Sequence, residues 1–198
     1  LIPRDKNDDN SSYTMADAVF TACFLNAMNR NCDIVGMANF APILNTRGCI
    51  YSYKDGVVLR STYHVFDLYV NHMGDTVLDS WEEGEKNTFT VSDKNGRKVT
   101  VNTLDILATQ HSETEKISIA VVNKEPDKEK KLEICLDENS YARYEVQEYR
   151  IVGSSVDSYN DIDRTEVFIE QLPTKETSGV YQVNLAPYSI NVIDFKIL

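Results

Sequence analysis

The chain of 198 residues lacks the features that would place it in several broad classes of protein. No apolar run approaches the roughly 20 residues that a membrane-spanning helix requires, and no signal peptide opens the chain. Its 20 basic residues are outnumbered by 31 acidic ones and form no cluster, which argues against binding to the phosphate backbone of nucleic acids. The net charge of −11 does not repel a neutral partner such as a sugar polymer. We therefore expect neither a membrane nor a nucleic-acid partner.

Cysteine and histidine are also scarce, and their spacing does not match the common metal-binding patterns. The four cysteines contain no C-x-x-C pair, and the three histidines do not lie at zinc spacing. Cys23 belongs to an apolar helical pattern and Cys135 alternates with apolar neighbours, so we expect both to be buried free thiols. We interpret His64 and His72 as packing or solvent-facing side chains. No metal and no cofactor are expected.

The first part of the chain has helical periodicity. Residues 13–31 contain neither glycine nor proline and are apolar on more than one side, which predicts a helix that is covered from more than one direction. Thr14 followed by Asp17 is typical of a capped first turn. A second helix is predicted over residues 62–72, because apolar residues recur on one face and Gly74 lies beyond its end.

The segment between the two predicted helices holds the candidate site. Residues 33–40 form a nearly continuous apolar run, which predicts a central parallel strand buried on both faces. Pro42 has no N–H to donate and ends this strand. The polar loop that follows would lie at the carboxyl end of the strand, where α/β folds place their chemistry. Asn45 and Arg47 in this loop are therefore the candidate substrate-binding residues. Residues 50–59 are interpreted as irregular.

Each candidate also has a structural interpretation. The side chain of Asn45 could cap the backbone of its own loop, and Arg47 could be an exposed arginine or a member of an ion pair. Trp81, together with Tyr51 and Tyr53, could stack on sugar rings, but packing in a core or between domains is favoured.

From about residue 75 onward apolar and polar residues alternate with a period of two. Turn signals separate the runs, including a hairpin signal at residues 93–96. The pattern predicts an antiparallel all-β sandwich or jelly roll over residues 76–198. The predicted runs lie at residues 99–101, 104–108, 117–121, 132–136, 180–185 and 190–192.

Residues 1–75 are predicted to be incomplete by themselves. They supply two helices and one buried strand, and such a strand needs a neighbour on each side to pair its backbone groups. We interpret them as the end of a larger α/β domain. Since the chain begins at Leu1 and not at methionine, we expect it to be a fragment or a processed product.

Four short stretches carry a resemblance to a known family. Residues 13–20 read Tyr-Thr-Met-Ala-Asp-Ala-Val-Phe and residues 38–45 read Ala-Asn-Phe-Ala-Pro-Ile-Leu-Asn. Residues 62–69 read Thr-Tyr-His-Val-Phe-Asp-Leu-Tyr, and residues 187–192 read Pro-Tyr-Ser-Ile-Asn-Val. In this order and spacing they resemble the carboxyl-terminal part of α-L-arabinofuranosidases of glycoside hydrolase family 51. The resemblance is strong over residues 13–75 and loose over residues 76–170.

The resemblance implies an α+β fragment. Residues 1–75 would be the last helix, strand and helix of a (β/α)8 barrel, and residues 76–198 would be a jelly-roll-like β-sandwich. The family is retaining and uses two glutamates about 5 Å apart. By resemblance both lie upstream of Leu1, so this chain should lack the catalytic residues and be inactive alone. Some members carry a sugar-binding glutamine where this chain has Pro42.

The implied partners are an arabinose-containing polysaccharide or oligosaccharide and the upstream barrel of the same polypeptide or of another copy. A homo-oligomer is also expected, and the sequence leaves the cellular compartment open. The alternative is a non-catalytic carbohydrate-binding or interaction β-sandwich with a helical docking segment. A surface strip of aromatic residues on the sandwich would favour this alternative, whereas a bare apolar face on residues 13–73 would favour the glycosidase fragment.

Overall fold

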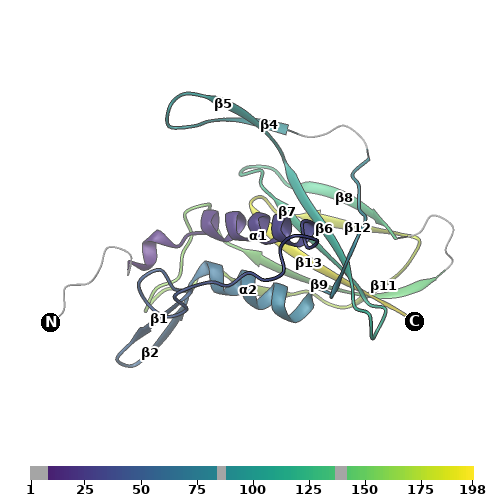
Figure 1. The fold of residues 1–198 in the computed structure, drawn as a ribbon, viewed down its shortest axis with the longest axis horizontal. Helices are drawn as coiled ribbons and strands as arrows, with labels where there is room; N and C mark the ends of the chain where they lie inside the picture. The colour runs from purple at the N-terminus through teal and green to yellow at the C-terminus, as the bar shows by residue number, and fades with distance from the viewer. Residues whose placement is uncertain (1–8, 84–87, 137–141) are drawn as a thin grey trace.

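The computed structural model describes residues 9–83, 88–136 and 142–198, in which two helices precede a domain of β-strands (Figure 1). The helical part contains a short 3-10 turn (Asn10–Ser12), α1 (Met15–Arg30), β1 (Ile50–Tyr53), β2 (Gly56–Leu59) and α2 (Ser61–His72). The strands that follow are β3 (Thr76–Leu78), β4 (Thr88–Ser92), β5 (Lys98–Asn102), β6 (Leu104–Gln110), β7 (Ile117–Asn123), β8 (Lys130–Cys135), β9 (Arg143–Val152), β10 (Phe168–Gln171), β11 (Lys175–Ser178), β12 (Val180–Leu185) and β13 (Ser189–Ile197).

Both predicted helices are confirmed, and the start of α1 is held by its own cap and by a distant loop. The carboxylate of Asp17 accepts hydrogen bonds from the backbone N–H of Thr14 at 2.8 Å and from its hydroxyl at 3.0 Å. The N–H of Met15 donates to the carbonyl of Ser158 at 2.8 Å. Because the first N–H groups of a helix have no partner within the helix, this loop satisfies donors that would otherwise be buried without one.

The predicted antiparallel β-rich region is also confirmed. Seven strands form one sheet in the order β10-β9-β13-β7-β6-β3, with β11 paired to a second part of β9. Strand β13 lies between β7 and β9, so that Ile190 is opposite both Val122 and Ile151. Strands β8 and β12 form a separate two-stranded sheet, and every pairing between named strands is antiparallel. The long strand β9 was not among the predicted runs.

The large sheet has a hydrophobic core on each face. Alternation along β13 directs Ile190 and Val192 toward α1 and α2, and Ile193 and Phe195 toward β8 and β12. All four side chains are buried. The seven-stranded sheet therefore lies between a layer of helices and a second, smaller sheet.

The predicted strand at residues 33–40 is wrong for this chain. Residues 31–34 form a turn and residues 35–40 have no regular secondary structure, while Ile34 and Met37 are each 79% exposed. A parallel strand exists only through hydrogen bonds to its neighbours, and the described residues supply none here. The region predicted to be irregular is a hairpin instead, with β1 and β2 joined through Lys54 and Asp55.

Two smaller expectations also change. Cys135 is exposed and not buried, and Cys23 is partly buried, with its pKa raised by burial to about 11. Gly74 follows the end of α2 as expected, but its backbone is not left-handed. A Cβ atom at Gly74 would lie 2.2 Å from the carbonyl oxygen of Gln110, so glycine is required by this close approach. Among the described residues, neither α1 nor α2 combines the length and apolarity that crossing a membrane would demand.

Candidate functional site

The loop of residues 43–49 carries both candidate substrate-binding residues. Asn45 and Thr46 have positive φ angles of 52° and 45°, a conformation that is uncommon for residues other than glycine. The side-chain oxygen of Asn45 accepts a hydrogen bond from the N–H of Ser52 at 2.7 Å. Arg47 is exposed and forms no ion pair with a residue that the structure describes. Asn45 therefore caps its loop, whereas the Arg47 side chain is open to solvent.

A buried arginine that the sequence reasoning missed holds this loop. Arg60 is fully buried, and its Nη1 donates to the carbonyls of Thr46 at 3.1 Å and Gly48 at 2.6 Å. Its Nε donates to the side-chain oxygen of Asn10 at 2.9 Å. The guanidinium lies 3.9 Å from the ring centroid of Tyr13, whose hydroxyl also donates to the Thr46 carbonyl, at 2.7 Å. A cation and an aromatic ring thus fix the loop from the inside.

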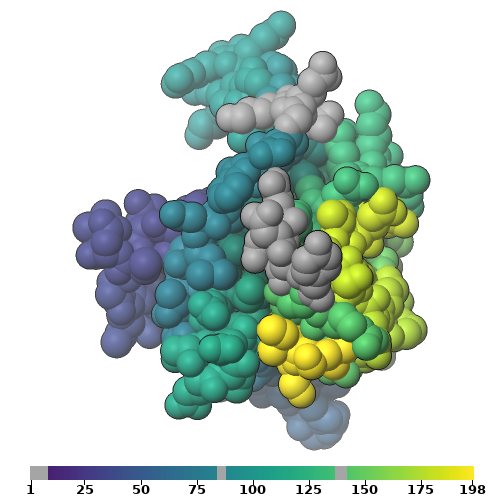
Figure 2. All heavy atoms as spheres, turned by 90° about the vertical axis from the view of Figure 1, so that its right-hand side faces the viewer, coloured from purple at the N-terminus to yellow at the C-terminus, as the bar shows by residue number. Residues whose placement is uncertain are grey.

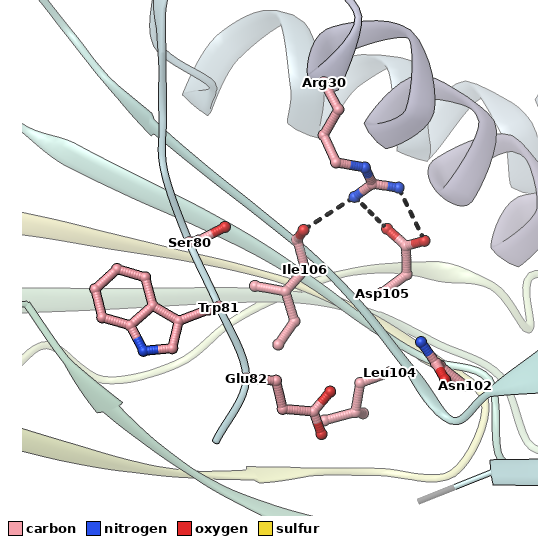
Figure 3. A pocket seen from close by; sticks show the side chains of 8 residues that line it. All are labelled: Arg30, Ser80, Trp81, Glu82, Asn102, Leu104, Asp105 and Ile106. Atoms are coloured by element: carbon pink, nitrogen blue, oxygen red, sulfur yellow. Dashed lines mark hydrogen bonds and ion pairs between the residues drawn. The ribbon is translucent and has the colours of Figure 1, made fainter. Parts of the chain in front are cut away.

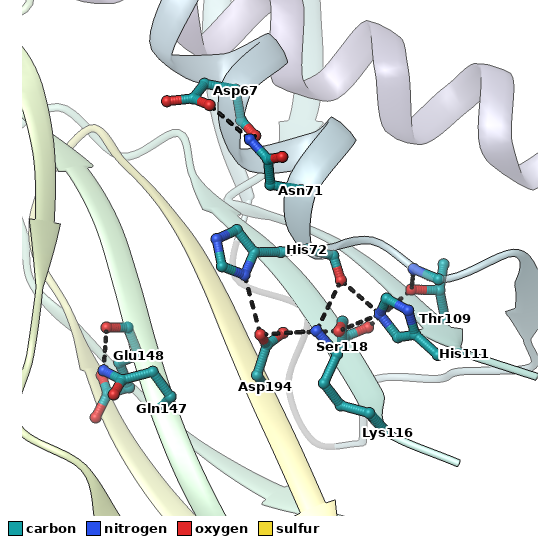
Figure 4. Close-up of polar contacts among 11 residues, drawn as sticks. Asp67, Asn71, His72, Thr109, His111, Lys116, Ser118, Gln147, Glu148 and Asp194 are labelled. Carbon is teal, nitrogen blue, oxygen red and sulfur yellow. Dashed lines mark hydrogen bonds and ion pairs between the residues drawn. The ribbon is translucent and has the colours of Figure 1, made fainter. Parts of the chain in front are cut away.

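A polar cluster at the end of α2 joins this helix to the large sheet (Figure 4). The carboxylate of Asp194 accepts hydrogen bonds from His72 Nδ1 at 3.0 Å, from Lys116 Nζ at 2.9 Å and from the Ser118 hydroxyl at 2.7 Å. Burial by itself would raise the pKa of Asp194, but these hydrogen bonds hold it below its ordinary value. Ser118 is fully buried, so its hydroxyl cannot reach a substrate. The cluster is a structural link.

A shallow cavity of about 250 Å³ lies between the end of α1, residues 80–82 and the junction of β5 with β6 (Figure 3). Arg30 and Asp105 form a double hydrogen bond there, at 3.0 and 3.1 Å. Trp81 also lines this cavity, but its indole points away from that ion pair and is 76% exposed. Trp81 therefore does not pack in this chain's core, and its expected packing between domains stays a prediction, while Tyr51 and Tyr53 stack on each other.

The helical segment exposes large apolar side chains along its outer side. On α1, Phe20 is 70% exposed and stacks with the exposed Phe24. On α2, Val70 is 78% exposed, and the loop between the helices exposes Ile34 and Met37. By contrast, the described residues of the β domain expose only two large aromatic side chains, Trp81 and Phe168.

Sequence comparison identifies the family. The family described as alpha-L-arabinofuranosidase C-terminal domain matches residues 4–189. The chain belongs to this family. A search of curated proteins found no match.

Solved structures agree with this membership of the α-L-arabinofuranosidase C-terminal domain family. An α-L-arabinofuranosidase from Thermotoga maritima, solved as an arabinose complex, is 26% identical with a TM-score of 0.83, over 100% of this chain and 41% of that one. The family 51 enzyme from Thermotoga petrophila RKU-1 is 26% identical with a TM-score of 0.80, over 98% of this chain and 40% of that one. A family 51 enzyme from Xanthomonas axonopodis pv. citri is 19% identical with a TM-score of 0.77, over 92% and 36%, and shows the fold alone.

This C-terminal domain thus spans about two fifths of the length of the two Thermotoga enzymes. Its two helices followed by an antiparallel β domain match the carboxyl-terminal region of family 51 arabinofuranosidases. The roles assigned to Asn45 and Arg47 are not addressed by these similarities and stay predictions.

Proposed function

We propose that this chain is the carboxyl-terminal region of a retaining α-L-arabinofuranosidase that releases arabinofuranosyl residues from arabinose-containing polysaccharides or oligosaccharides. Residues 9–75 supply the last two helices of a catalytic (β/α)8 barrel and the segment that joins them. Residues 76–198 form a jelly-roll-like β-sandwich that supports the barrel. The family membership and the arabinose complex of the Thermotoga maritima relative support this proposal.

The observation that carries the proposal is the bare apolar outer side of the helical segment. Burying one large apolar side chain is worth roughly 1.5–3 kcal/mol, and here Phe20, Phe24 and Val70 remain in water. Residues 35–40 have exposed backbone without a strand partner among the described residues. Both features are expected of a barrel segment whose neighbours lie elsewhere.

Within this proposal the loop of residues 43–49 borders the sugar pocket. Arg47 would contact the substrate, and Asn45 would shape the loop while presenting its side-chain amide. Retaining hydrolysis needs an acid/base and a nucleophile, and we assign both to barrel strands upstream of this chain. The exposed Trp81 and Phe168 favour the alternative of a carbohydrate-binding sandwich, but two aromatic side chains do not make the strip that such a surface requires.

The test of activity uses an aryl α-L-arabinofuranoside as substrate. We expect no hydrolysis by the 198-residue chain and hydrolysis by a longer polypeptide that includes a complete barrel. Turnover by the 198-residue chain that disappears when one of its own glutamates is changed to glutamine would overturn the proposal. A longer polypeptide with no activity on any arabinoside would overturn it as well.

The incompleteness of the helical segment is tested by sedimentation and limited proteolysis of the 198-residue chain. We expect self-association or early cleavage within residues 31–44. A monodisperse monomer in which residues 9–75 resist protease would show that the β domain alone satisfies this segment.

A further inference from the structure

Strands β4 and β5 form an arm that stands away from the rest of the domain (Figure 1). In the described part of the chain these two strands pair only with each other. The turn between them is well made, because the Asp93 carboxylate accepts hydrogen bonds from the N–H groups of Asn95 and Arg97, each at 2.8 Å. An isolated two-stranded hairpin is marginally stable in water, so we expect the arm to be covered by a partner.

The two faces of the arm differ in polarity. Phe89 is opposite Val101 and Val91 is opposite Val99, which places four apolar side chains on one face. The opposite face is polar and includes the pair of Thr90 and Thr100. Val91 is 43% exposed and Val99 is 39% exposed, so the apolar face is open.

The base of the arm lies beside the end of α1, because Asn102 of β5 and Arg30 of α1 line the same cavity. The ladder of β6 continues through Thr103 toward β5, because the Thr103 carbonyl accepts a hydrogen bond from the N–H of Lys124 at 2.8 Å. A bend at Thr103 separates β5 from β6, and Asp105, just beyond this bend, bonds Arg30 of α1. Figure 2 shows the arm at the top of the molecule, with the N-terminal residues at the left and the C-terminal strands at the right.

We propose that the arm docks on the part of the same polypeptide that precedes this chain, on a surface of the barrel next to α1. This proposal rests on the proposed function. The base of the arm lies beside the end of α1, and Phe20 of this helix is exposed. The Thermotoga relatives contain about three fifths of their length outside the matched region. One body placed beside α1 and the arm would cover the apolar side chains of both.

The tip of the arm indicates the chemistry of this docking surface. Lys94, Arg97 and Lys98 cluster there with a single acidic residue, Asp93, although the whole chain carries a net charge of −11. The docking surface is therefore an apolar patch bordered by acidic residues, and added salt should weaken the contact.

The test compares two double substitutions in the same arm. Val91→Lys with Val99→Lys places charge on the apolar face, whereas Thr90→Lys with Thr100→Lys places the same charge on the polar face. In the longer polypeptide with a complete barrel, we expect the valine pair to lower the Tm. We also expect amide hydrogen exchange in the arm to accelerate about tenfold or more, the factor that corresponds to 1.4 kcal/mol of docking free energy. The threonine pair should change neither the Tm nor the hydrogen exchange of the arm. In the 198-residue chain the two pairs of substitutions should have the same effect on both quantities.

Three outcomes would overturn the proposal. The first is an equal effect of both pairs in the longer polypeptide. The second is a selective effect of the valine pair in the 198-residue chain as a monomer, which would show that the arm packs within this chain. The third is an effect that grows with protein concentration and changes the sedimentation coefficient, which would make a second copy the partner. Failure of the proposed function is distinct, because it appears as missing arabinosidase activity while the protection of the arm by the longer polypeptide is unchanged.

Discussion

The helical segment and the β domain differ in how many of their faces this chain covers. Both faces of the seven-stranded sheet are buried, one under the helices and the other under β8 and β12. The helices are buried on one side only: Leu68 of α2 is buried against the sheet, whereas Val70, two residues later, is largely exposed. The same sequence therefore completes the packing of its sheet and leaves the packing of its helices to another surface.

Polar contacts refine this comparison. Asn160 of the β domain donates to the carbonyls of Leu59 at 2.8 Å and Val167 at 2.7 Å, and accepts from the N–H of Val167 at 2.8 Å. Through such contacts the hairpin and both helices are joined to the β domain. Residues 31–44 have no such polar contact with a described residue of the β domain, and most of them are exposed. The surfaces that this chain leaves unpacked are thus residues 31–44 and the outer side of the two helices.

The largest effect on stability is expected from removing the buried guanidinium of Arg60 beneath the loop of residues 43–49. Arg60→Met leaves the buried carbonyl of Gly48 and the side-chain oxygen of Asn10 without their donor. We expect a loss of about 3–5 kcal/mol in the free energy of unfolding, measured by urea denaturation. Arg47→Met is the matched control on the exposed side of the same loop and should change stability by no more than about 0.5 kcal/mol. Equal effects of the two substitutions would contradict the assignment of Arg60 as the anchor.

A second pair of substitutions measures the difference between the two sides of α2. Leu68→Ala should lower the free energy of unfolding of the 198-residue chain by about 3 kcal/mol, because it removes buried methyl groups and leaves a cavity. Val70→Ala should change it by less than about 0.5 kcal/mol, since Val70 is exposed in this chain. In the longer polypeptide Val70→Ala should become destabilising. A neutral effect there would contradict the claim that another surface covers the outer side of α2.

The elements that could be predicted from the sequence are those set by local pattern. The start of α1 was predictable because Thr14 and Asp17 cap it within one turn. The runs of β6, β7 and β13 were predictable because apolar residues recur along them, and the structure buries both sides of each strand in a core. Residues 33–40 also have the composition of a strand, but a strand requires neighbours, and local pattern cannot show whether the chain supplies them.

The contacts that could not be predicted join residues far apart in sequence. Arg60 directly precedes α2, where a charged residue is ordinary, and only the fold places it under residues 46 and 48. His72 and Asp194 are 122 positions apart, so no spacing rule connects them. Asn45 was predictable as a loop residue, and its bond to the Ser52 N–H matches the structural interpretation given from the sequence.

The smallest effect on stability is expected from the contact between His72 of α2 and Asp194 of β13. Because the folded pKa of Asp194 lies below its ordinary value of 3.8, the folded protein favours the ionised carboxylate. Its contribution to stability is therefore fully present at neutral pH and is lost as the pH falls from 3.8 through the folded value. Asp194→Asn removes the charge that accepts hydrogen bonds from His72 and Lys116.

We expect Asp194→Asn to be less stable than the original chain at pH 7 and to approach its stability as the pH falls toward 2. Urea denaturation followed by circular dichroism at pH 7, 5, 3 and 2 gives the two curves directly. A difference between them that stays constant down to pH 2 would mean that the carboxylate does not hold α2 to the sheet through its charge. The attachment of the helical segment to the β domain would then rest on apolar packing alone, through side chains such as Leu68 and Val65.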